Sequence, residues 1–398
     1  MLRRTAIALL SVALVASATA CGSDAEPAST QTGSVSWEPC AGGVQCATLA
    51  VPLDRAKPDG ETIELALARR PAGGDSKGVL LTNPGGPGGS GVELVRSAEN
   101  LFSDEILDTF DIVSWDPRGV GDSAPVRCLD NLDDYYAADR SPDSAQEEKQ
   151  TTAATQAFVD ACEENSGNLL PHVSTEDTVA DMDAIRGALG QETVSYIGFS
   201  YGTYLGALYA EQYPDRVRAM VLDGALDPTL SFTDLTIQQA EGFDNALDEF
   251  FEFCRTEGCG FSPSADPAET FDKLATSVDA EPVFANLNGE DRTLGPGEFD
   301  IGVASGLYSG RAGWKELGAA LAQTATGLGN ELLALSDAYT QRLPGGQYSN
   351  STAAFNAVGC LDAIDPPKAG ELDELAAEAA EVAPRFGAST AWLSQACT

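Results

Sequence analysis

The sequence predicts an α/β fold: a mostly parallel sheet with helices on its faces, followed by a helical lid. Between residues 60 and 225, short apolar runs alternate with helical stretches, which is typical of such a sheet. After residue 228 strand-like runs become rare and long helical patterns replace them. A chain of 398 residues, 43% hydrophobic, is long enough to bury a full core. We therefore expect a sheet core over residues 37–228 and a lid over 229–398.

Five short runs supply the expected strands. In the first, Ile63, Leu65 and Leu67 alternate with polar or small residues, as on a half-buried edge strand. Continuous apolar runs predict interior strands. They are Val79-Leu80-Leu81, Ile112-Val113, Val194 to Ile197, and Met220-Val221-Leu222.

Two helices are predicted on either side of the strand Val194 to Ile197. One runs from Glu176 to Leu189, with Ser174 or Thr175 as its N-cap and Gly190 as its stop. The other begins just after Ser200 and ends before Pro214. Further along, the Ala-rich acidic stretch 371–382 is most simply a helix with a solvated face.

Residues 1–20 have the features of a signal peptide. Two arginines precede an apolar run that is too short to span a bilayer permanently. Ala18-Thr19-Ala20 fits an ordinary cleavage site, and with Cys21 it resembles a lipobox that has Ala where Leu is usual. We expect export, with a lipid on Cys21 as the membrane contact and residues 21–36 as a tether. Free secretion with an unstructured N-terminus is the alternative.

The cysteines suit an oxidising compartment. If Cys21 carries lipid, eight of the nine remain, an even number. Short separations favour two pairs and leave four cysteines for two more. The expected pairs are Cys40 with Cys46, Cys254 with Cys259, Cys128 with Cys162, and Cys360 with Cys397. No C-x-x-C pair supports a zinc site.

Charge and histidine content exclude several partners. The net charge of −38 leaves no large basic surface for phosphates, so we do not expect nucleic acid to bind. His172 is the single histidine, too few for a His-rich metal centre. We expect neither a metal nor a cofactor.

The strongest local motif is Gly198-Phe199-Ser200-Tyr201-Gly202, placed between a predicted strand and a predicted helix. A serine on such a sharp turn stands clear of the sheet, because the glycines let neighbouring chain pass closely. The helix start directs free N–H groups toward the place where an oxyanion would develop. We expect Ser200 to be a nucleophile; a turn-forming serine is the alternative.

A glycine-rich loop, Asn83 to Gly91, directly follows a predicted strand. Bare backbone of this kind can approach a substrate carbonyl and supply half of an oxyanion hole. We expect the donors to be Gly86 and the backbone of Tyr201. A P-loop is excluded because no Gly-Lys-Ser/Thr follows; a merely flexible loop is the alternative.

Several segments in order resemble the secreted bacterial tripeptidyl aminopeptidases, α/β-hydrolases related to proline iminopeptidases. The resemblance runs from about Trp37 to Cys397. It is carried by Trp37 to Cys40, Val51 to Asp54, Asn83 to Gly91, Trp115 to Ser123, Gly198 to Gly202 and Val221 to Gly224. It implies that Ser200 is acylated and that the substrate is a peptide trimmed from its free N-terminus. Related members act as esterases or lipid hydrolases.

Four charged residues near these motifs are expected to be structural. Asp116 and Arg118 should form a pair or brace the turn, and Asp223 and Asp227 should be turn residues.

The sequence departs from the family in its triad. Such enzymes place Ser, acid and His in that order, and no histidine follows Ser200. His172 precedes it, in a loop position that is usually structural. The resemblance implies that the acid and the histidine lie on two further strand-and-loop units, so we expect the last strands to be missing from this chain. A segment encoded downstream or a separate C-terminal complementing chain would supply them.

Three functions remain open. Loss of the base costs a serine triad on the order of 10⁶ in kcat, so the chain by itself is expected to be nearly inert. An aminopeptidase that releases tripeptides is the first hypothesis, and a carboxylesterase or lipase of the same fold is the second. A non-catalytic binding lipoprotein that retains the scaffold is the third.

Overall fold

The computed structural model describes residues 35–368 and 370–398. The predictions of a signal peptide, a lipid on Cys21 and most of the tether therefore lie outside the described residues. Val35 and Trp37 pack against the sheet core, and Val35 still falls within the expected tether. Among the described residues, no helix combines the length and the apolar composition that crossing a bilayer requires.

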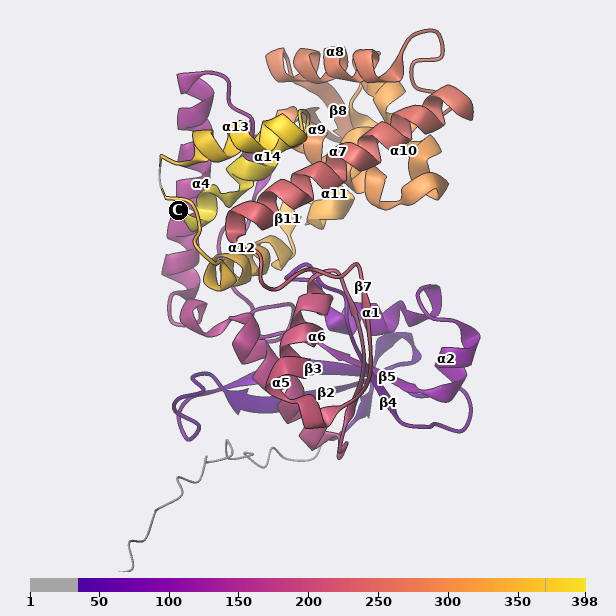
Figure 1. The fold of residues 1–398 in the computed structure, drawn as a ribbon, viewed down its shortest axis with the longest axis vertical. Coiled ribbons are helices and arrows are strands. Elements are labelled where there is room, and N and C mark those ends of the chain that lie inside the picture. The colour runs from indigo at the N-terminus through magenta and orange to yellow at the C-terminus, as the bar shows by residue number, and fades with distance from the viewer. Residues whose placement is uncertain (1–34, 369) are drawn as a thin grey trace, which may run out of the picture. The chain divides into compact units, whose positions relative to one another are not determined.

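Seven strands form one sheet in the order β1-β2-β3-β5-β4-β6-β7 (Figure 1). They are β1 (Glu38–Pro39), β2 (Gln45–Pro52), β3 (Thr62–Arg70), β4 (Val79–Asn83), β5 (Asp111–Trp115), β6 (Val194–Phe199) and β7 (Val217–Asp223). The pairs β4/β5, β4/β6 and β6/β7 are parallel, whereas β3 is antiparallel to both β2 and β5. Thus β2 and β4 to β7 share one direction, which confirms the predicted mostly parallel sheet.

The prediction of an edge strand at Ile63 to Leu67 is wrong. The strand that contains these residues, β3, lies between β2 and β5, and Leu65 and Leu67 are buried. The error arises from β2, whose mixture of small and polar residues gives no strong strand pattern. Because β2 covers the outer side of β3, the alternation that indicated an edge marks an interior strand instead.

The prediction that Met220 to Leu222 is interior is also wrong for the described sheet. Their strand, β7, is the last in the order, and no described strand pairs with its outer edge. Residues 220 and 222 face α6, while Val221 on the opposite face is 55% exposed. The strand β7 therefore carries more apolar side chains than the described residues cover.

Helices cover both faces of the sheet. On one face α5 (Thr175–Ala188) and α6 (Tyr201–Gln212) bury residues such as Met182 and Leu205 against Leu81 and Val113. On the other, α1 (Gly91–Arg96) and α2 (Asp104–Thr109) pack in a second cluster with the neighbouring strand residues. Both predicted helices are confirmed, with Ser174 as the N-cap of α5.

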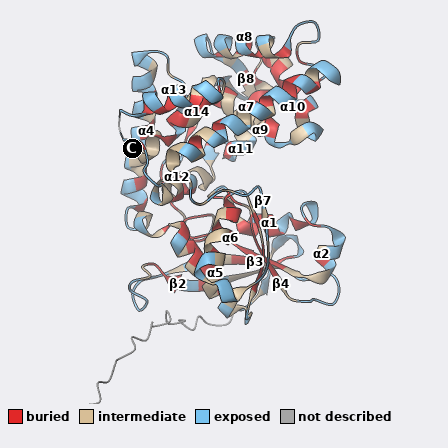
Figure 2. Ribbon diagram, viewed as in Figure 1, coloured by how far each residue is buried: buried red, intermediate tan, exposed pale blue. Residues whose placement is uncertain are grey.

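The remaining helices form a layer of their own, and the largest of the hydrophobic clusters within this layer is rich in phenylalanine and leucine. They are α7 (Phe232–Thr256), α8 (Pro267–Ala280), α9 (Pro296–Tyr308), α10 (Gly310–Thr324), α11 (Asn330–Thr340), α12 (Ser351–Asp362), α13 (Leu372–Val382) and α14 (Gly387–Trp392). Two short hairpins accompany them, β8 (Val283–Leu287) with β9 (Glu290–Leu294), and β10 (Arg342–Leu343) with β11 (Gln347–Tyr348). In Figure 2 the buried positions of these helices face one another and the exposed ones face outward.

Part of the helical layer comes from earlier in the chain. The helices α3 (Asp133–Ala137) and α4 (Ala145–Ser166) lie before β6 in sequence, yet α3 contacts α9 and α4 contacts the C-terminal turn η5 (Leu393–Cys397). Figure 1 shows α4 near the C-terminus of the chain, in agreement with that contact. The helical layer thus draws on two stretches of chain, whereas the sequence predicts one.

Four disulfides lie within the described residues, in the pairing that the sequence predicts. They join Cys40 to Cys46, Cys128 to Cys162, Cys254 to Cys259, and Cys360 to Cys397. The last ties α12 to the C-terminal turn.

Candidate active site

Ser200 occupies the turn between β6 and α6. Its backbone has φ 51° and ψ −121°, a conformation that non-glycine residues rarely adopt and that costs on the order of 1–3 kcal/mol. The residue is exposed, and no described residue shares a hydrogen bond with its hydroxyl. Its amide donates to the carbonyl of Asp223 at 2.9 Å, which ties the turn to the end of β7. The turn therefore presents a free hydroxyl.

The two glycines of the motif are required by close packing. A Cβ at position 198 would lie 2.2 Å from the Gly202 carbonyl oxygen, and one at position 202 would lie 2.7 Å from that of Asn83. Tyr196 also donates its hydroxyl to the Gly202 carbonyl at 2.7 Å. The backbone of the turn is thus closely packed against Asn83 and Tyr196, while the Ser200 side chain stays exposed.

The loop from Asn83 to Gly91 lies directly against this turn. A Cβ at Gly85 would stand 3.1 Å from both the Tyr201 nitrogen and the Ser200 Cβ, so the missing side chain leaves space beside that amide. The Gly85 amide itself donates to Asn83 Oδ1 at 2.9 Å. Gly86 is exposed, and neither its amide nor that of Tyr201 has a hydrogen-bond acceptor among the described residues. Two free amides thus flank the serine turn.

Asp116 joins the end of this glycine-rich segment and the start of α1 to the loop that follows β5. Its buried carboxylate accepts from the Ser90 hydroxyl at 2.6 Å and from the Val92 and Asp122 amides at 3.1 and 3.0 Å. Burial raises the pKa of Asp116. These bonds hold the start of α1 against the end of β5.

Arg118 is a separate brace, so the predicted pair between Asp116 and Arg118 is wrong while the bracing role holds. Its fully buried guanidinium binds both oxygens of Asp181, at 2.7 and 2.9 Å. It also donates to the carbonyls of Pro52, Leu53 and His172. The two side chains leave the loop in different directions, one toward α1 and the other toward α5.

His172 is held in this second network through its backbone. Its carbonyl accepts from Arg118 Nη1 at 2.9 Å, and no hydrogen bond joins its ring to Ser200. Asp227 accepts from the Thr229 amide at 2.9 Å in a local turn, and Asp223 contributes its carbonyl to the Ser200 amide. None of these three side chains meets the serine hydroxyl in the described structure.

Two residues beside the site, Thr175 and Asp362, are linked to it by no sequence pattern. Thr175 hydrogen-bonds to the Tyr201 hydroxyl and to Asp362, residues 26 and 187 positions away in the chain. Only the folded structure brings these residues together.

Among the described residues, one group of carboxylates is close enough to share a cation: Asp139, Glu147 and Asp279 lie with one oxygen each within 4.8 Å of one another. Local structure accounts for two of them. Asp139 accepts from the Ser141 amide at 2.8 Å, and Glu147 caps α4 by accepting from the Ser144 amide at 3.0 Å. We assign no metal to them.

Comparison with known proteins agrees with this geometry. The family described as alpha/beta hydrolase fold matches residues 78–323. Serine protease Hip1 of Mycobacterium tuberculosis H37Rv is 36% identical over 95% of this chain and 76% of its own length. Tripeptidyl aminopeptidase of Streptomyces lividans is 32% identical, over 83% of this chain and 64% of its own. Carboxylesterase B of Mycobacterium tuberculosis H37Rv is 34% identical, over 81% and 63%.

These matches confirm the predicted resemblance, the fold class and the general class of serine hydrolases. The relatives differ in the substrates that their names imply, whereas they share the fold. The serine turn, the adjoining glycine loop and the parallel strands that position both are therefore features of a known architecture, and the chain belongs to the α/β-hydrolase fold family.

Proposed function

We propose that this chain is an exported serine hydrolase that trims short peptides, such as tripeptides, from free N-termini. The observation that supports it is the exposed hydroxyl of Ser200 on a strained turn, with the unbonded amides of Gly86 and Tyr201 beside it. Backbone amides aimed at a developing oxyanion are the largest electrostatic contribution to acyl transfer, on the order of 10²–10³ in kcat for one donor.

The chemistry proceeds through an acyl-enzyme on Ser200. The hydroxyl oxygen bonds to the peptide carbonyl carbon, its proton passes to a base, and the carbonyl electron pair moves to the oxygen that the two amides receive. Collapse expels the amine, which takes up the proton, and water then repeats the sequence to release the acid.

The base and its acid come, in this proposal, from a further C-terminal segment or a separate complementing chain. The outer edge of β7 is unpaired in the described sheet, and Val221 beside it is exposed. An added strand can pair with such an edge through its main chain. Because β7 ends at Asp223, whose carbonyl holds the Ser200 amide, a strand paired there would lead toward the serine.

A peptide substrate is favoured over an ester by two considerations. The relatives with serine protease and tripeptidyl aminopeptidase names cover more of this chain than the carboxylesterase does. A net charge of −38 also attracts a substrate that carries a free ammonium group. Tripeptide anilides should therefore be turned over, and blocking the amine should abolish turnover. Equal turnover of blocked anilides, or faster turnover of short acyl esters, would favour the carboxylesterase or lipase.

Labelling with a fluorophosphonate tests the nucleophile. With the proposed C-terminal segment or complementing chain supplied, the protein should carry the adduct on Ser200, and Ser200→Ala should carry none. Ser262→Ala is the matched control, because Ser262 also has a positive φ, 52°, but lies outside the site. An adduct on another residue would refute the proposal. Peptide binding without label or turnover would favour the binding lipoprotein.

We further propose that the protein is exported and anchored by a lipid on Cys21. The four disulfides support an oxidising compartment. Cell fractionation of a Cys21→Ala variant tests the anchor: the variant should leave the membrane fraction for the medium, and an unchanged distribution would count against the lipid.

A further inference from the structure

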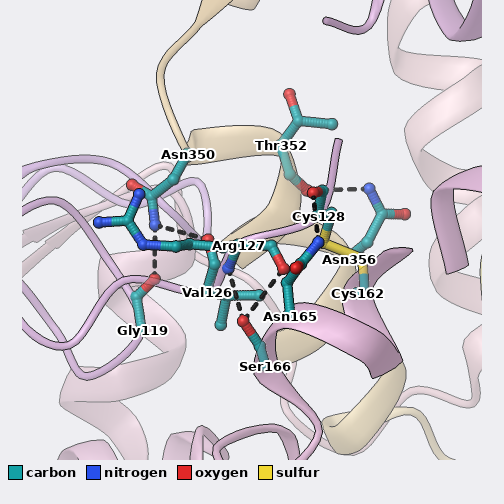
Figure 3. Close-up of a disulfide and its surroundings, with 10 residues drawn as sticks. All are labelled: Gly119, Val126, Arg127, Cys128, Cys162, Asn165, Ser166, Asn350, Thr352 and Asn356. Atoms are coloured by element: carbon teal, nitrogen blue, oxygen red, sulfur yellow. Dashed lines mark hydrogen bonds between the residues drawn. A yellow bond between two sulfur atoms is a disulfide. The ribbon is translucent and has the colours of Figure 1, made fainter. Parts of the chain in front are cut away.

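The helix α12 contacts the glycine loop with its first turns. A Cβ at Gly88 would lie 2.4 Å from the Ser351 carbonyl oxygen and 3.2 Å from the Phe355 nitrogen, so loop backbone and helix are in direct contact. Just before the helix, Asn350 donates to the Gly119 carbonyl at 2.7 Å, as Figure 3 shows, and accepts from the Gly121 amide at 2.9 Å. One end of α12 thus contacts the loop that carries Gly86 and is hydrogen-bonded to the loop that follows β5.

The other end of α12 is fixed to the serine turn. Asp362, its last residue, accepts from the Thr175 amide at 2.9 Å with one carboxylate oxygen and from the Thr175 hydroxyl with the other. The Thr175 hydroxyl has one proton, which it gives to Asp362, so the Tyr201 hydroxyl donates to the Thr175 oxygen. Tyr201, which directly follows Ser200, therefore ends a chain of hydrogen bonds that begins on α12.

Packing reinforces this connection. The Tyr201 side chain is 7% exposed and shares a hydrophobic cluster with Ala353 and Val358 of α12. Its backbone amide, at the first position of α6, is one of the two proposed oxyanion donors. A side chain held at both its ring and its hydroxyl limits how far that amide can move.

The placement of the carboxylate is electrostatically sound. Thr175 is the first residue of α5, and a carboxylate at a helix N-terminus is favoured by the helix dipole. Burial raises the pKa of Asp362, and the like charges of Glu176 and Asp177 raise it further. The two hydrogen bonds from Thr175 act in the opposite direction and favour the carboxylate.

We propose that Asp362 is a positioning residue: through Thr175 it fixes Tyr201, and with the contact at Gly88 it makes α12 a brace across both halves of the oxyanion site. The inference rests on the proposed function. It assigns to the helical layer a part in the chemical step, and Asp362 itself touches no substrate. Its loss should slow the attack of Ser200 on the substrate carbonyl carbon while substrate affinity stays the same.

The test compares four variants by the second-order rate of fluorophosphonate reaction at Ser200, in the complete protein. Asp362→Asn and Thr175→Val should react about tenfold more slowly, less than the 10²–10³ for a donor removed outright. Thr175→Ser keeps the hydroxyl and should react within about twofold of the wild type. Asp365→Asn is the control for Asp362→Asn, because it makes the same chemical change three residues further along the chain, at an exposed side chain. It should also react within about twofold of the wild type.

Two further readouts separate positioning from folding and from failure of the proposed function. The ³¹P shift of the adduct should move in Thr175→Val and not in Thr175→Ser. The ¹H–¹⁵N shift of the Tyr201 amide should follow the same pattern even where no label forms. If Thr175→Val fails to fold, Tyr201→Phe removes only the terminal hydroxyl of the chain. Unmoved shifts and rates in these variants would overturn the positioning role while leaving Ser200 as nucleophile, whereas an unlabelled wild type would refute the proposed function alone.

Discussion

The exposure of the Ser200 hydroxyl depends on glycines, which have no side chain, as much as on the residues whose side chains pack around the turn. Gly85, Gly198 and Gly202 each stand where a Cβ would collide with backbone of the turn or of the neighbouring loop. Because the serine turn is already strained, these close contacts have little room to relax. The site therefore depends on backbone approach, which any larger residue would prevent.

Gly85→Ala should reduce fluorophosphonate labelling of Ser200 by on the order of 10²–10³, since the methyl group would fill the space beside the Tyr201 amide. The control is Gly42→Ala. Gly42 has φ 82° against 89° at Gly85, but an added Cβ there meets nothing within 4 Å. Rates measured for both variants separate backbone strain from collision. Equal labelling of the two variants would contradict the collision argument.

The residues of the site differ in how far the sequence could predict them. Ser200 and the glycine loop are carried by local patterns whose geometry follows from a few adjacent residues. Asp362 and Thr175 meet across 187 positions, so no local pattern indicates them. Asp116 and Arg118 mislead for the opposite reason: they are neighbours in sequence whose side chains point to different elements.

At the scale of elements, a buried ion pair locks α5 to the loops at the sheet edge. Asp181 of α5 is fully buried and binds both Arg55 and Arg118. Breaking such a pair leaves an uncompensated charge in the interior, at a cost of about 3–5 kcal/mol. α5 also carries Thr175, so this network helps to hold Thr175 in place beside Tyr201.

Asp181→Asn should lower the free energy of unfolding by about 3–5 kcal/mol, measured by denaturant titration. Asp183→Asn is the companion variant on the same helix. Asp183 pairs with Arg186 and Arg216 at a more accessible position, its side chain 14% exposed, so the loss should be clearly smaller. Equal losses in the two variants would show that burial does not govern the cost.

The elements that sequence reasoning missed share a physical cause. Apolar periodicity reports burial, and burial depends on neighbours from elsewhere in the chain. β3 gave an alternating pattern although β2 covers it, and β7 gave a buried pattern although its outer edge is open in the described sheet. Helices with strong caps, such as α5 with Ser174, were predicted well because capping is local.

At the scale of the whole molecule, several hydrophobic clusters stabilise the described chain. The first group lies on the two faces of the sheet, and another cluster lies among α7 to α11. A further cluster joins the sheet to the helical layer, since Tyr201 packs there with Ala353 and Val358. The alternation of strands and helices was enough to predict the first. The return of α3 and α4 into the helical layer could not be predicted, because their contacts with α9 and η5 span more than 150 residues.

The molecule as a whole should lose stability as the pH rises toward neutrality, and Glu298 offers a way to measure one part of that loss. Burial raises the pKa of this carboxyl, which caps the start of α9, to about 7. Between its ordinary value near 4.5 and about 7, the folded state holds a proton that the unfolded state releases. The free energy of unfolding therefore falls by at most about 3 kcal/mol across this pH window. Above the window it no longer changes with the titration of Glu298.

Glu298→Gln keeps an acceptor for the Gly295 amide and removes the titration. Denaturant titrations from about pH 5 to pH 8 should show the variant close to the wild type at the acid end and ahead of it at the alkaline end. The repulsion that follows from a net charge of −38 contributes almost equally to both proteins, so the difference between them isolates this one carboxyl. Parallel pH profiles would mean that Glu298 titrates normally in the folded protein. A variant that gains stability only at alkaline pH would instead locate a specific buried acid as a source of the pH dependence of the fold.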